Sequence, residues 1–436
     1  MRLRLREGDR VCIVGGGPAG SSAALHLLRL AGAAGLNLEI LLFEPHKPQH
    51  LGARSCKGCA GILSDGALRQ MAALDLAVPP DVVQAELRAY VVHVAGQVTS
   101  IVQPDPRRRI LSVYRGSGPR LHRGAPLASF DAHLLGAATA RGARHIPERV
   151  RRVEWEDGPV VYTDTGRFPA SFLVLATGVN SLPPLSPAFG YEPPESVPMA
   201  QDEILRPPNW PEDKVAGFFD QPPGLVFGAV VPKGAYLNVS LLWDGAPDDA
   251  IQRLYEAQRE GLGRFFPEMP SSCCSCHPRI LVTPARTYYG ERWVAVGDAA
   301  VARLYKDGIN SAFITSGSAM RTAVEHGIDR ESFAMAYVPA CRAIADDNRY
   351  GKLLYSVASR ALRNPELARA CVSCVRAEAG LRADRRLYSR LMWGMLTGDE
   401  PYRELFRLIV QPRGLLDFGR QLLHREGGLP AQRTPS

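Results

Sequence analysis

The chain has 436 residues, of which 46% are apolar and 22% charged, with 52 Lys and Arg against 44 Asp and Glu. The apolar fraction excludes a mostly disordered protein, and 9 cysteines in so long a chain are too few for a disulfide scaffold. No run of about 18 apolar residues occurs, so the sequence predicts no transmembrane helix. The length suits two or three interleaved domains.

A βαβ unit is predicted at the start of the chain. Its parts are an apolar run at 11–14, a glycine cluster at 15–20, a helix over 22–30 and a second apolar run at 38–43. The second run ends at Glu44. This order of strand, glycine turn, helix, strand and terminal acid is typical of a dinucleotide-binding site.

The glycines of this unit match the pattern G-x-G-x-x-G. In that pattern the first glycine allows a tight turn, the second lets the backbone approach a pyrophosphate, and the third lets the helix pack closely on the strand. The free N–H groups at the start of the helix then face the phosphates. The predicted nucleotide contacts are Gly15, Gly17, Pro18, Ala19 and Gly20, with Glu44 on the ribose hydroxyls.

Further elements follow along the chain. Periodicity predicts a helix to about 76, two strands within 87–102, a helix over 130–140, a strand pair within 150–165 and a buried strand at 172–176. The proline-dense segment 181–223 is predicted to be irregular. A hairpin is predicted over 226–231 and 236–243, and a buried strand at 293–296. From Asn310 the pattern is helical almost to Arg425, with breaks near 364–365, 397–398 and 411–412.

A second nucleotide element follows the strand at 293–296. Gly297 and Asp298 end that strand, and after Lys306-Asp307 a helix opens with Gly308, Ile309 and Asn310. This pairing resembles the Gly-Asp motif of flavoproteins of the p-hydroxybenzoate hydroxylase superfamily, in which the aspartate binds the ribityl chain of FAD. Phe130-Asp131-x-x-Leu134 and the segment 176–181 resemble the same superfamily. The resemblance implies that FAD is the cofactor.

Two positions depart from the superfamily pattern or fit it loosely. Arg123 is our candidate for the arginine that the superfamily places before Phe130-Asp131. Thr177 stands where the superfamily has an aspartate that serves both FAD and NADPH. The electron donor is therefore left open between NAD(P)H and a reduced ferredoxin-like protein.

The segment 59–64, Cys-Ala-Gly-Ile-Leu-Ser, resembles the Cys-Gly-Gly-Gly-type motif of the geranylgeranyl reductase family. The segment 227–234, followed by Asn238-Val239, resembles the family signature Tyr-x-Trp-x-Phe-Pro-x-Gly, with Phe, Ala and Val at its three aromatic positions. The resemblance implies hydride transfer from reduced FAD to carbon–carbon double bonds of an isoprenoid or similar hydrophobic substrate, and it places Cys59 beside the flavin. Cys59 is our candidate for the catalytic proton donor, with shaping of the pocket as the alternative role. The implied substrate contacts are Cys59, Gly61, Phe227, Ala229, Val231, Pro232 and Gly234.

Two other functions compete with this one. One is an FAD-dependent monooxygenase that hydroxylates a hydrophobic or aromatic substrate. The other is a flavin electron carrier or lipid-binding subunit without turnover of its own. The partners expected from the sequence are a hydrophobic small molecule and an electron-donor protein, without nucleic acid.

The expected fold class is α/β, or α+β overall. A Rossmann-like FAD-binding domain (8–75, 115–180 and 285–330) is interleaved with an antiparallel-sheet substrate domain (76–114 and 181–284). A C-terminal helical region (331–426) and a flexible tail (427–436) follow.

The cysteines allow more than one interpretation. Cys56 and Cys59 have the Cys-x-x-Cys spacing of redox dithiols, and with Cys273, Cys274, Cys276, His277, Cys371 and Cys374 they offer metal or cluster ligands. Buried or incidental thiols are the simpler interpretation. We therefore assign no metal.

Residues 341–436 carry 17 Lys and Arg and 10 Asp and Glu, which accounts for most of the net charge of +8. A solvated arginine face on packed helices explains this excess, and a peripheral contact with anionic lipid is the alternative. The odd cysteine count and the lack of a recognisable signal peptide predict a cytoplasmic protein, with peripheral contact at the inner membrane face as that same alternative.

Overall fold

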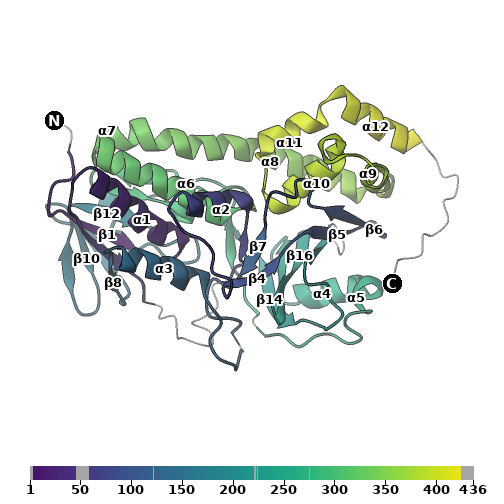
Figure 1. The fold of residues 1–436 in the computed structure, drawn as a ribbon, viewed down its shortest axis with the longest axis horizontal. Coiled ribbons are helices and arrows are strands. Elements are labelled where there is room, and N and C mark those ends of the chain that lie inside the picture. The colour runs from purple at the N-terminus through teal and green to yellow at the C-terminus, as the bar shows by residue number, and fades with distance from the viewer. Residues whose placement is uncertain are drawn as a thin grey trace.

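The computed structural model describes residues 3–45, 58–120, 122–219, 222, 224–273 and 275–423. One half of the molecule is built on a six-stranded sheet in the order β19-β20-β12-β1-β2-β8 (Figure 1). Its strands pair in parallel except at the antiparallel β19–β20 edge. They are β1 (Arg10–Val14), β2 (Glu39–Phe43), β8 (Arg144–Ile146), β12 (Phe172–Leu175), β19 (Tyr289–Gly290) and β20 (Trp293–Ala295).

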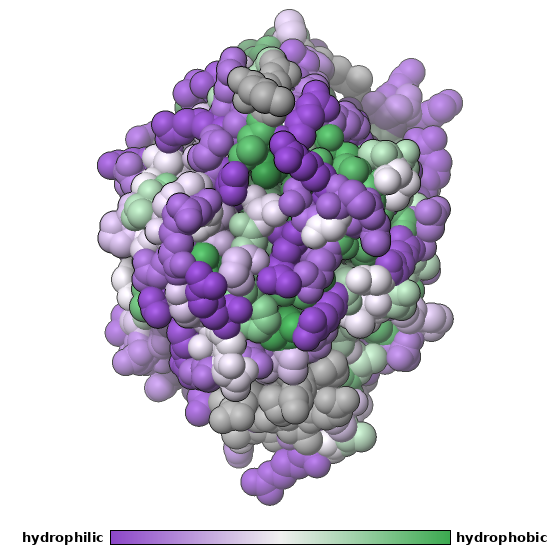
Figure 2. Space-filling model, turned by 90° about the vertical axis from the view of Figure 1, so that its left-hand side faces the viewer, coloured by the Kyte–Doolittle hydropathy of each residue, from purple (hydrophilic) through white to green (hydrophobic). Residues whose placement is uncertain are grey.

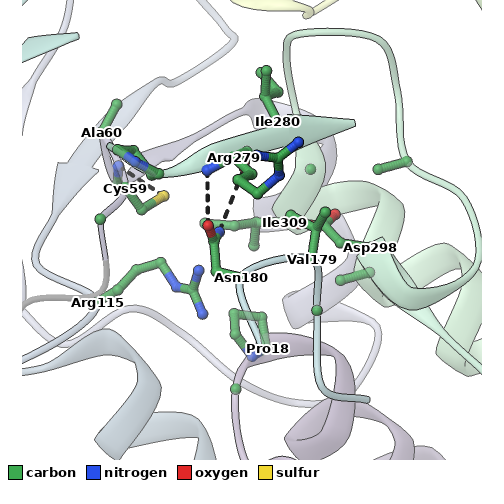
Figure 3. A pocket seen from close by; sticks show the side chains of 18 of the residues that line it. Pro18, Cys59, Ala60, Arg115, Val179, Asn180, Arg279, Ile280, Asp298 and Ile309 are labelled. Carbon is green, nitrogen blue, oxygen red and sulfur yellow. Dashed lines mark hydrogen bonds between the residues drawn. The ribbon is translucent and has the colours of Figure 1, made fainter. Parts of the chain in front are cut away.

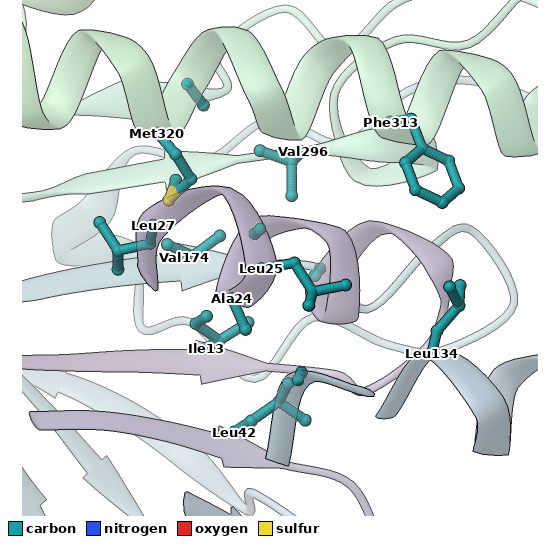
Figure 4. Close-up of a cluster of buried hydrophobic side chains, with 14 of the residues drawn as sticks. Ile13, Ala24, Leu25, Leu27, Leu42, Leu134, Val174, Val296, Phe313 and Met320 are labelled. Carbon is teal, nitrogen blue, oxygen red and sulfur yellow. The ribbon is translucent and has the colours of Figure 1, made fainter. Parts of the chain in front are cut away.

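Helices cover one face of this sheet. They are α1 (Pro18–Ala33), α3 (Phe130–Ala140) and α6 (Gly308–Arg321). Proline is favourable at the first helical position, where its missing N–H is not needed, so α1 begins directly after the glycine turn. Ile13, Leu25 and Val174 are fully buried where α1 meets the sheet, and Phe313 packs above them from α6 (Figure 4).

A small antiparallel sheet covers the opposite face. It consists of β9 (Arg152–Trp155), β10 (Pro159–Tyr162) and β11 (Arg167–Pro169). Val153 and Val161 are buried in one cluster with Cys12 and Leu173 of the main sheet. Because both faces are covered, the central strands are apolar and buried, except for Arg10 and Glu39 where β1 and β2 begin.

The other half is built on a second six-stranded sheet, in the order β14-β17-β16-β15-β5-β6. Its strands pair antiparallel except for β15 with β5. They are β5 (Ala89–Val94), β6 (Gln97–Val102), β14 (Ala200–Leu205), β15 (Lys214–Phe218), β16 (Leu225–Lys233) and β17 (Tyr236–Trp243). The helices α4 (Ala250–Ala257) and α5 (Arg259–Leu262) lie beside this sheet (Figure 1).

Shorter elements join the two halves. One small sheet has the order β3-β7-β4, and β13 pairs with β18. The bounds are β3 (Ile62–Leu63), α2 (Asp65–Ala72), β4 (Val83–Glu86), β7 (Leu111–Val113), β13 (Ser196–Pro198) and β18 (Arg279–Leu281). Single turns of 3₁₀ or π type are η2 (Pro187–Phe189), η3 (Gly297–Ala299), η4 (Thr322–His326), η5 (Phe333–Tyr337) and η6 (Ala383–Arg385).

The C-terminal region is helical. Its elements are α7 (Arg330–Ser332), α8 (Val338–Arg363), α9 (Pro365–Ala377), α10 (Leu387–Thr397), α11 (Tyr402–Ile409) and α12 (Pro412–Leu423). Helix α8 runs along the top of the molecule in Figure 1 and links the nucleotide-binding half to the bundle of α9–α12. The predicted breaks are confirmed: Asn364 caps α9, α10 ends at Thr397, and α12 begins at Pro412. None of the described helices is both long and apolar enough to cross a bilayer.

Most predicted elements are confirmed, and the exception is the segment 181–223. It holds β13, β14 and β15, so the prediction of an irregular segment was wrong. The prolines lie between these strands or at their ends, where no ladder hydrogen bond is lost. The strand pair predicted within 150–165 also gains β11 as a third strand. The face in Figure 2 is mostly hydrophilic, with only small hydrophobic areas between charged side chains.

Candidate functional site

A cavity of about 990 Å³ lies where the nucleotide-binding sheet, the second sheet and the loop before α6 meet. It is large enough for a cofactor together with part of a substrate. Several predicted residues line it: Gly15, Gly17, Pro18, Ala19, Glu44, Cys59, Gly61, Phe227, Ala229, Val231, Asp298, Gly308 and Ile309. Segments far apart in the sequence are thus brought to one site (Figure 3).

The glycine turn between β1 and α1 has the geometry that the motif predicts. Gly15 has φ +108°, and a Cβ there would lie 2.5 Å from the carbonyl oxygen of Ala176. A Cβ on Gly20 would lie 1.7 Å from the carbonyl oxygen of Gly15, so Gly20 is a packing residue beneath the cavity and does not line it. Gly17 caps α1 without a side-chain hydrogen bond, which leaves the helix N-terminus available to an anion.

Two polar groups border this turn. The Gly16 amide donates to the Glu44 carboxylate over 3.0 Å, which holds Glu44 at the end of β2. Thr177, at the end of β12, has a buried hydroxyl oxygen without a hydrogen-bond partner in the described structure. Because both residues line the cavity, a bound nucleotide could supply hydroxyl or phosphate partners to them.

Arg115 lines the cavity beside the glycine turn. Its Nε and Nη2 donate to the Asp131 carboxylate over 3.0 and 2.9 Å, and both residues line the cavity. Burial alone would lower the pKa of Arg115, but Asp131, Cys59 and Asp298 raise it above its usual value. Arg123, our candidate from the sequence, is exposed and does not line the cavity. The two hydrogen bonds to Asp131 fix the orientation of the Arg115 guanidinium. Spacing in the sequence alone could not distinguish Arg115 from Arg123.

The second nucleotide element lies opposite the glycine turn. Asp298 faces the cavity, and its burial raises the pKa of the carboxyl group while Arg115 opposes that shift. Gly308 and Ile309 line the cavity at the N-terminus of α6, which no side chain caps. Gly297 and Asn310 do not line it. Gly297 has φ +61° and packs against Ala19, and Asn310 donates to Asp307 over 2.8 Å.

Cys59 lies at the edge of the cavity in a loop that ends at β3. Its Sγ accepts from the Gly61 amide at 3.4 Å, and its carbonyl oxygen accepts from Lys233 Nζ at 3.3 Å. A Cβ on Gly61 would lie 2.0 Å from the carbonyl oxygen of Val113, so only glycine fits there. Figure 3 shows Arg115 and Cys59 on the same side of the cavity.

Strand β16 provides an apolar wall. Phe227, Ala229 and Val231 alternate along it, so their side chains share one face of the sheet, and all three line the cavity. Pro232 and Gly234 do not line it. The Pro232 carbonyl accepts from Ser112 Oγ over 2.6 Å, and Gly234 forms the hairpin turn with φ +61°. These two residues shape the wall and do not form it.

Lys306, Asn180 and Arg279 line the cavity, although the sequence assigned no role to them. Lys306 lies with its Nζ 3.9 Å from the centre of the Phe227 ring, and burial lowers the pKa of Lys306 to about 8. Asn180 accepts from the Arg279 amide over 2.7 Å (Figure 3). The position of Lys306 between the Asp298 turn and α6 is the sequence feature that could have indicated a place in the cavity. The contact between Asn180 and Arg279 joins the loop after β12 to strand β18, and these segments are too distant in sequence to be paired from one chain.

The alternatives of a metal site and a redox dithiol rest on cysteines, and the structure describes only some of these cysteines. Cys56 and Cys274 lie outside the described residues, so the Cys56–Cys59 pair stays a hypothesis. Within the described ranges, no group of three or more His, Cys, Asp or Glu side chains could hold a metal ion.

Comparison with known proteins bears on the cofactor. Residues 12–180 match a family model described as FAD-NAD(P)-binding. No curated protein matches the sequence.

Solved structures share the fold at low identity. A geranylgeranyl bacteriochlorophyll reductase-like protein from Thermoplasma acidophilum is 16% identical over 96% of this chain and 100% of its own, with a TM-score of 0.60. A flavoprotein/dehydrogenase from Cytophaga hutchinsonii is 15% identical over 92% and 99%, with a TM-score of 0.63. A 2-methyl-3-hydroxypyridine-5-carboxylic acid oxygenase is 16% identical over 82% and 93%, with a TM-score of 0.58.

The chain therefore has the fold of the FAD-binding oxidoreductases and oxygenases, which confirms the expected fold class. The family match and the flavoprotein neighbours support FAD as the cofactor. The residues present fit this group. The uncapped α1 terminus and Arg115 suit the pyrophosphate, Glu44 suits ribose hydroxyls, and Asp298 lies beside the second helix terminus.

Proposed function

We propose that this protein is an FAD-dependent reductase of geranylgeranyl reductase type, which reduces carbon–carbon double bonds of an isoprenoid or similar hydrophobic substrate. The observation that carries the proposal is the apolar wall of β16 in the same cavity as the nucleotide contacts and Cys59. Ile62, Tyr90 and Leu396 extend that apolar lining. A prenyl chain gains free energy by burial against such a surface.

When bound and reduced, FAD supplies a hydride. The residues of the chain have three tasks in this proposal. The β16 wall binds the apolar chain and excludes water, which strengthens electrostatic interactions in the cavity. The Cys59 loop, held by Lys233 and Gly61, presents a thiol at the cavity edge. That thiol delivers a proton to the second carbon of the double bond.

The test is single-turnover reduction without oxygen. Flavin-loaded protein is reduced with dithionite and mixed with geranylgeraniol, and the product is examined by mass spectrometry for added hydrogen. The Cys59→Ser variant should keep its flavin and lose most of the product. Cys371→Ser is the matched control, because Cys371 lies on α9 and does not line the cavity. Unchanged turnover in Cys59→Ser would remove Cys59 from the mechanism.

A repeat in the presence of oxygen separates the reductase from the monooxygenase. Saturated product from the anaerobic mixture supports the reductase. Oxygenated product that forms only in air, with no hydrogenated product under either condition, would replace the reductase by the monooxygenase. Tight flavin binding without product under any condition would favour the electron-carrier function.

We further propose that the C-terminal helices touch an anionic membrane surface, through which a lipid substrate would enter. Leu415, Leu416 and Leu423 on α12 are 58%, 61% and 83% exposed, and Arg420 lies on the same helix. Exposed leucines beside arginine are typical of interfacial helices. Sedimentation with phosphatidylserine vesicles should decrease with salt and in Leu415→Ser/Leu416→Ser. Binding that is independent of both would contradict this contact.

A further inference from the structure

Lys306 has an unusual position in the cavity. It lies in the loop between η3 and α6, and its Nζ is 3.9 Å from the centre of the Phe227 ring on the apolar wall. A Cβ on Gly398 would lie 2.8 Å from the Cβ of Lys306, so the chain after α10 packs closely on the start of this side chain. The amine is therefore directed along the wall where the apolar substrate would bind.

No acid neutralises this amine within the described parts of the chain. Lys306 has no ion pair or hydrogen bond there, and its ammonium group lies over the ring of Phe227. The acids next to it are engaged elsewhere. Asp307 accepts from Ser64 at 2.5 Å and from Asn310 at 2.8 Å, and Asp399 accepts from Arg108 at 3.1 Å.

The neighbouring cation is also engaged. Arg303 donates to the carbonyl oxygens of Gly398 and Glu400, and its guanidinium lies 4.2 Å from the centre of the Tyr402 ring. Lys233 is buried and is paired with Glu203 at 3.0 Å. Lys306 thus differs from both, because its charge has been taken out of water without an ionic partner, an arrangement that costs free energy.

We propose that Lys306 binds a carboxylate at the polar end of an otherwise apolar substrate. This inference rests on the proposed function and narrows the substrate class to apolar carboxylic acids, such as an isoprenoid acid. A single ammonium group matches a single negative charge. A prenyl diphosphate carries several charges, which one ammonium group does not match.

The geometry also explains why the amine borders an aromatic ring. The face of Phe227 attracts an ammonium group and holds it on the wall while the cavity is empty. A carboxylate on the ligand replaces this weak contact by a charge-assisted hydrogen bond. The chain of the ligand then lies along Ala229 and Val231, which line the cavity farther along β16.

Equilibrium dialysis with the oxidised, flavin-loaded protein tests the inference without turnover. The probes are farnesoic acid and farnesol, which share an apolar chain and differ at one end. The wild-type protein should bind the acid about 10- to 100-fold more tightly than the alcohol. Lys306→Met, which keeps the length of the side chain, should lose this preference, and Lys306→Arg should keep most of it. Lys352→Met, at an exposed lysine on α8, is the control.

Each outcome decides the question. Equal affinity of the wild-type protein for acid and alcohol would overturn the inference, and so would a preference that persists in Lys306→Met. If Lys306→Met does not fold, a preference retained by Lys306→Gln would overturn it in the same way. Acid binding without reduction would uphold Lys306 while the reductase proposal fails. Reduction of geranylgeraniol without a preference for the acid would uphold the reductase proposal and overturn the role of Lys306. Failure of both farnesoic acid and farnesol to bind would contradict both proposals.

Discussion

Lys233 and Glu203 form an ion pair at 3.0 Å in which the two side chains are only 2% and 3% exposed. The pair joins β16 to β14, and Lys233 Nζ also donates to the carbonyl oxygen of Cys59. The ammonium lies 4.5 Å from the centre of the Tyr114 ring. A buried charge pair inside the second sheet therefore helps to hold the loop that presents Cys59 to the cavity.

Removing one member of this pair should destabilise the protein strongly. Lys233→Met leaves the Glu203 carboxylate buried without a cation, which costs about 3–5 kcal/mol of unfolding free energy. The double variant Lys233→Met/Glu203→Leu should recover most of that loss, because no uncompensated charge remains. Urea unfolding measures both. Arg151→Met, in the exposed pair with Asp164, should change little. Equal losses in the single and double variants would contradict this account.

Arg115 and Arg123 should differ in their effect on flavin binding. Arg115→Ala removes the cation that borders Gly17 in the cavity, and loss of a charge-assisted contact to phosphate should weaken FAD binding about 10-fold or more. Arg115→Lys should restore only part of the affinity, since it lacks the planar fork. Arg123→Ala should bind FAD like the wild-type protein. Flavin fluorescence titration measures all three, and the opposite ranking would return the role to Arg123.

The glycine turn allows a matched comparison within one helix. In Gly20→Ala the new methyl group meets the carbonyl oxygen of Gly15, so the variant should lose about 1–3 kcal/mol or fail to fold. Gly32→Ala, near the end of the same helix, meets nothing within 4 Å and should be neutral or more stable by up to about 1 kcal/mol. Thermal unfolding of the two proteins checks this. Equal effects would show that the close approach of α1 to β1 is unimportant.

Stability should depend on pH through Lys306. Burial lowers the pKa of Lys306 from 10.5 to about 8, so between these values the unfolded chain binds more protons than the folded one. Unfolding free energy should therefore rise with pH through this window, by at most about 3 kcal/mol, and this group should contribute no slope below pH about 7.

The same measurement on Lys306→Met isolates the effect. Tyrosines that titrate near this window, including Tyr305, are common to both proteins and cancel in the difference. The difference between wild-type and variant unfolding free energies should change between about pH 8 and pH 10. A constant difference would mean that the Lys306 amine is solvated in the folded protein.

Local patterns were sufficient for the nucleotide-binding half. The run 11–14, the glycine turn and Glu44 lie close together in sequence, and the steric reason for Gly20 is the carbonyl oxygen of Gly15 in the same turn. The helix at 130–140 was predicted from periodicity with its observed bounds, and the structure shows that Ser129 caps it. The hairpin of β16 and β17 likewise follows from alternating residues around a glycine turn.

The tertiary structure alone decided which charges meet. Asp131 selects Arg115 over Arg123, and Glu203 reaches Lys233 across the strand between β14 and β16. Proline density concealed β14 and β15, because a composition does not show where prolines lie relative to strand ends. The desolvation of Lys306 depends on Phe227 and Gly398, which are distant in sequence. Neighbouring residues determine short-range steric constraints, so the sequence shows them. Ion pairs and burial depend on contacts that only the folded chain creates.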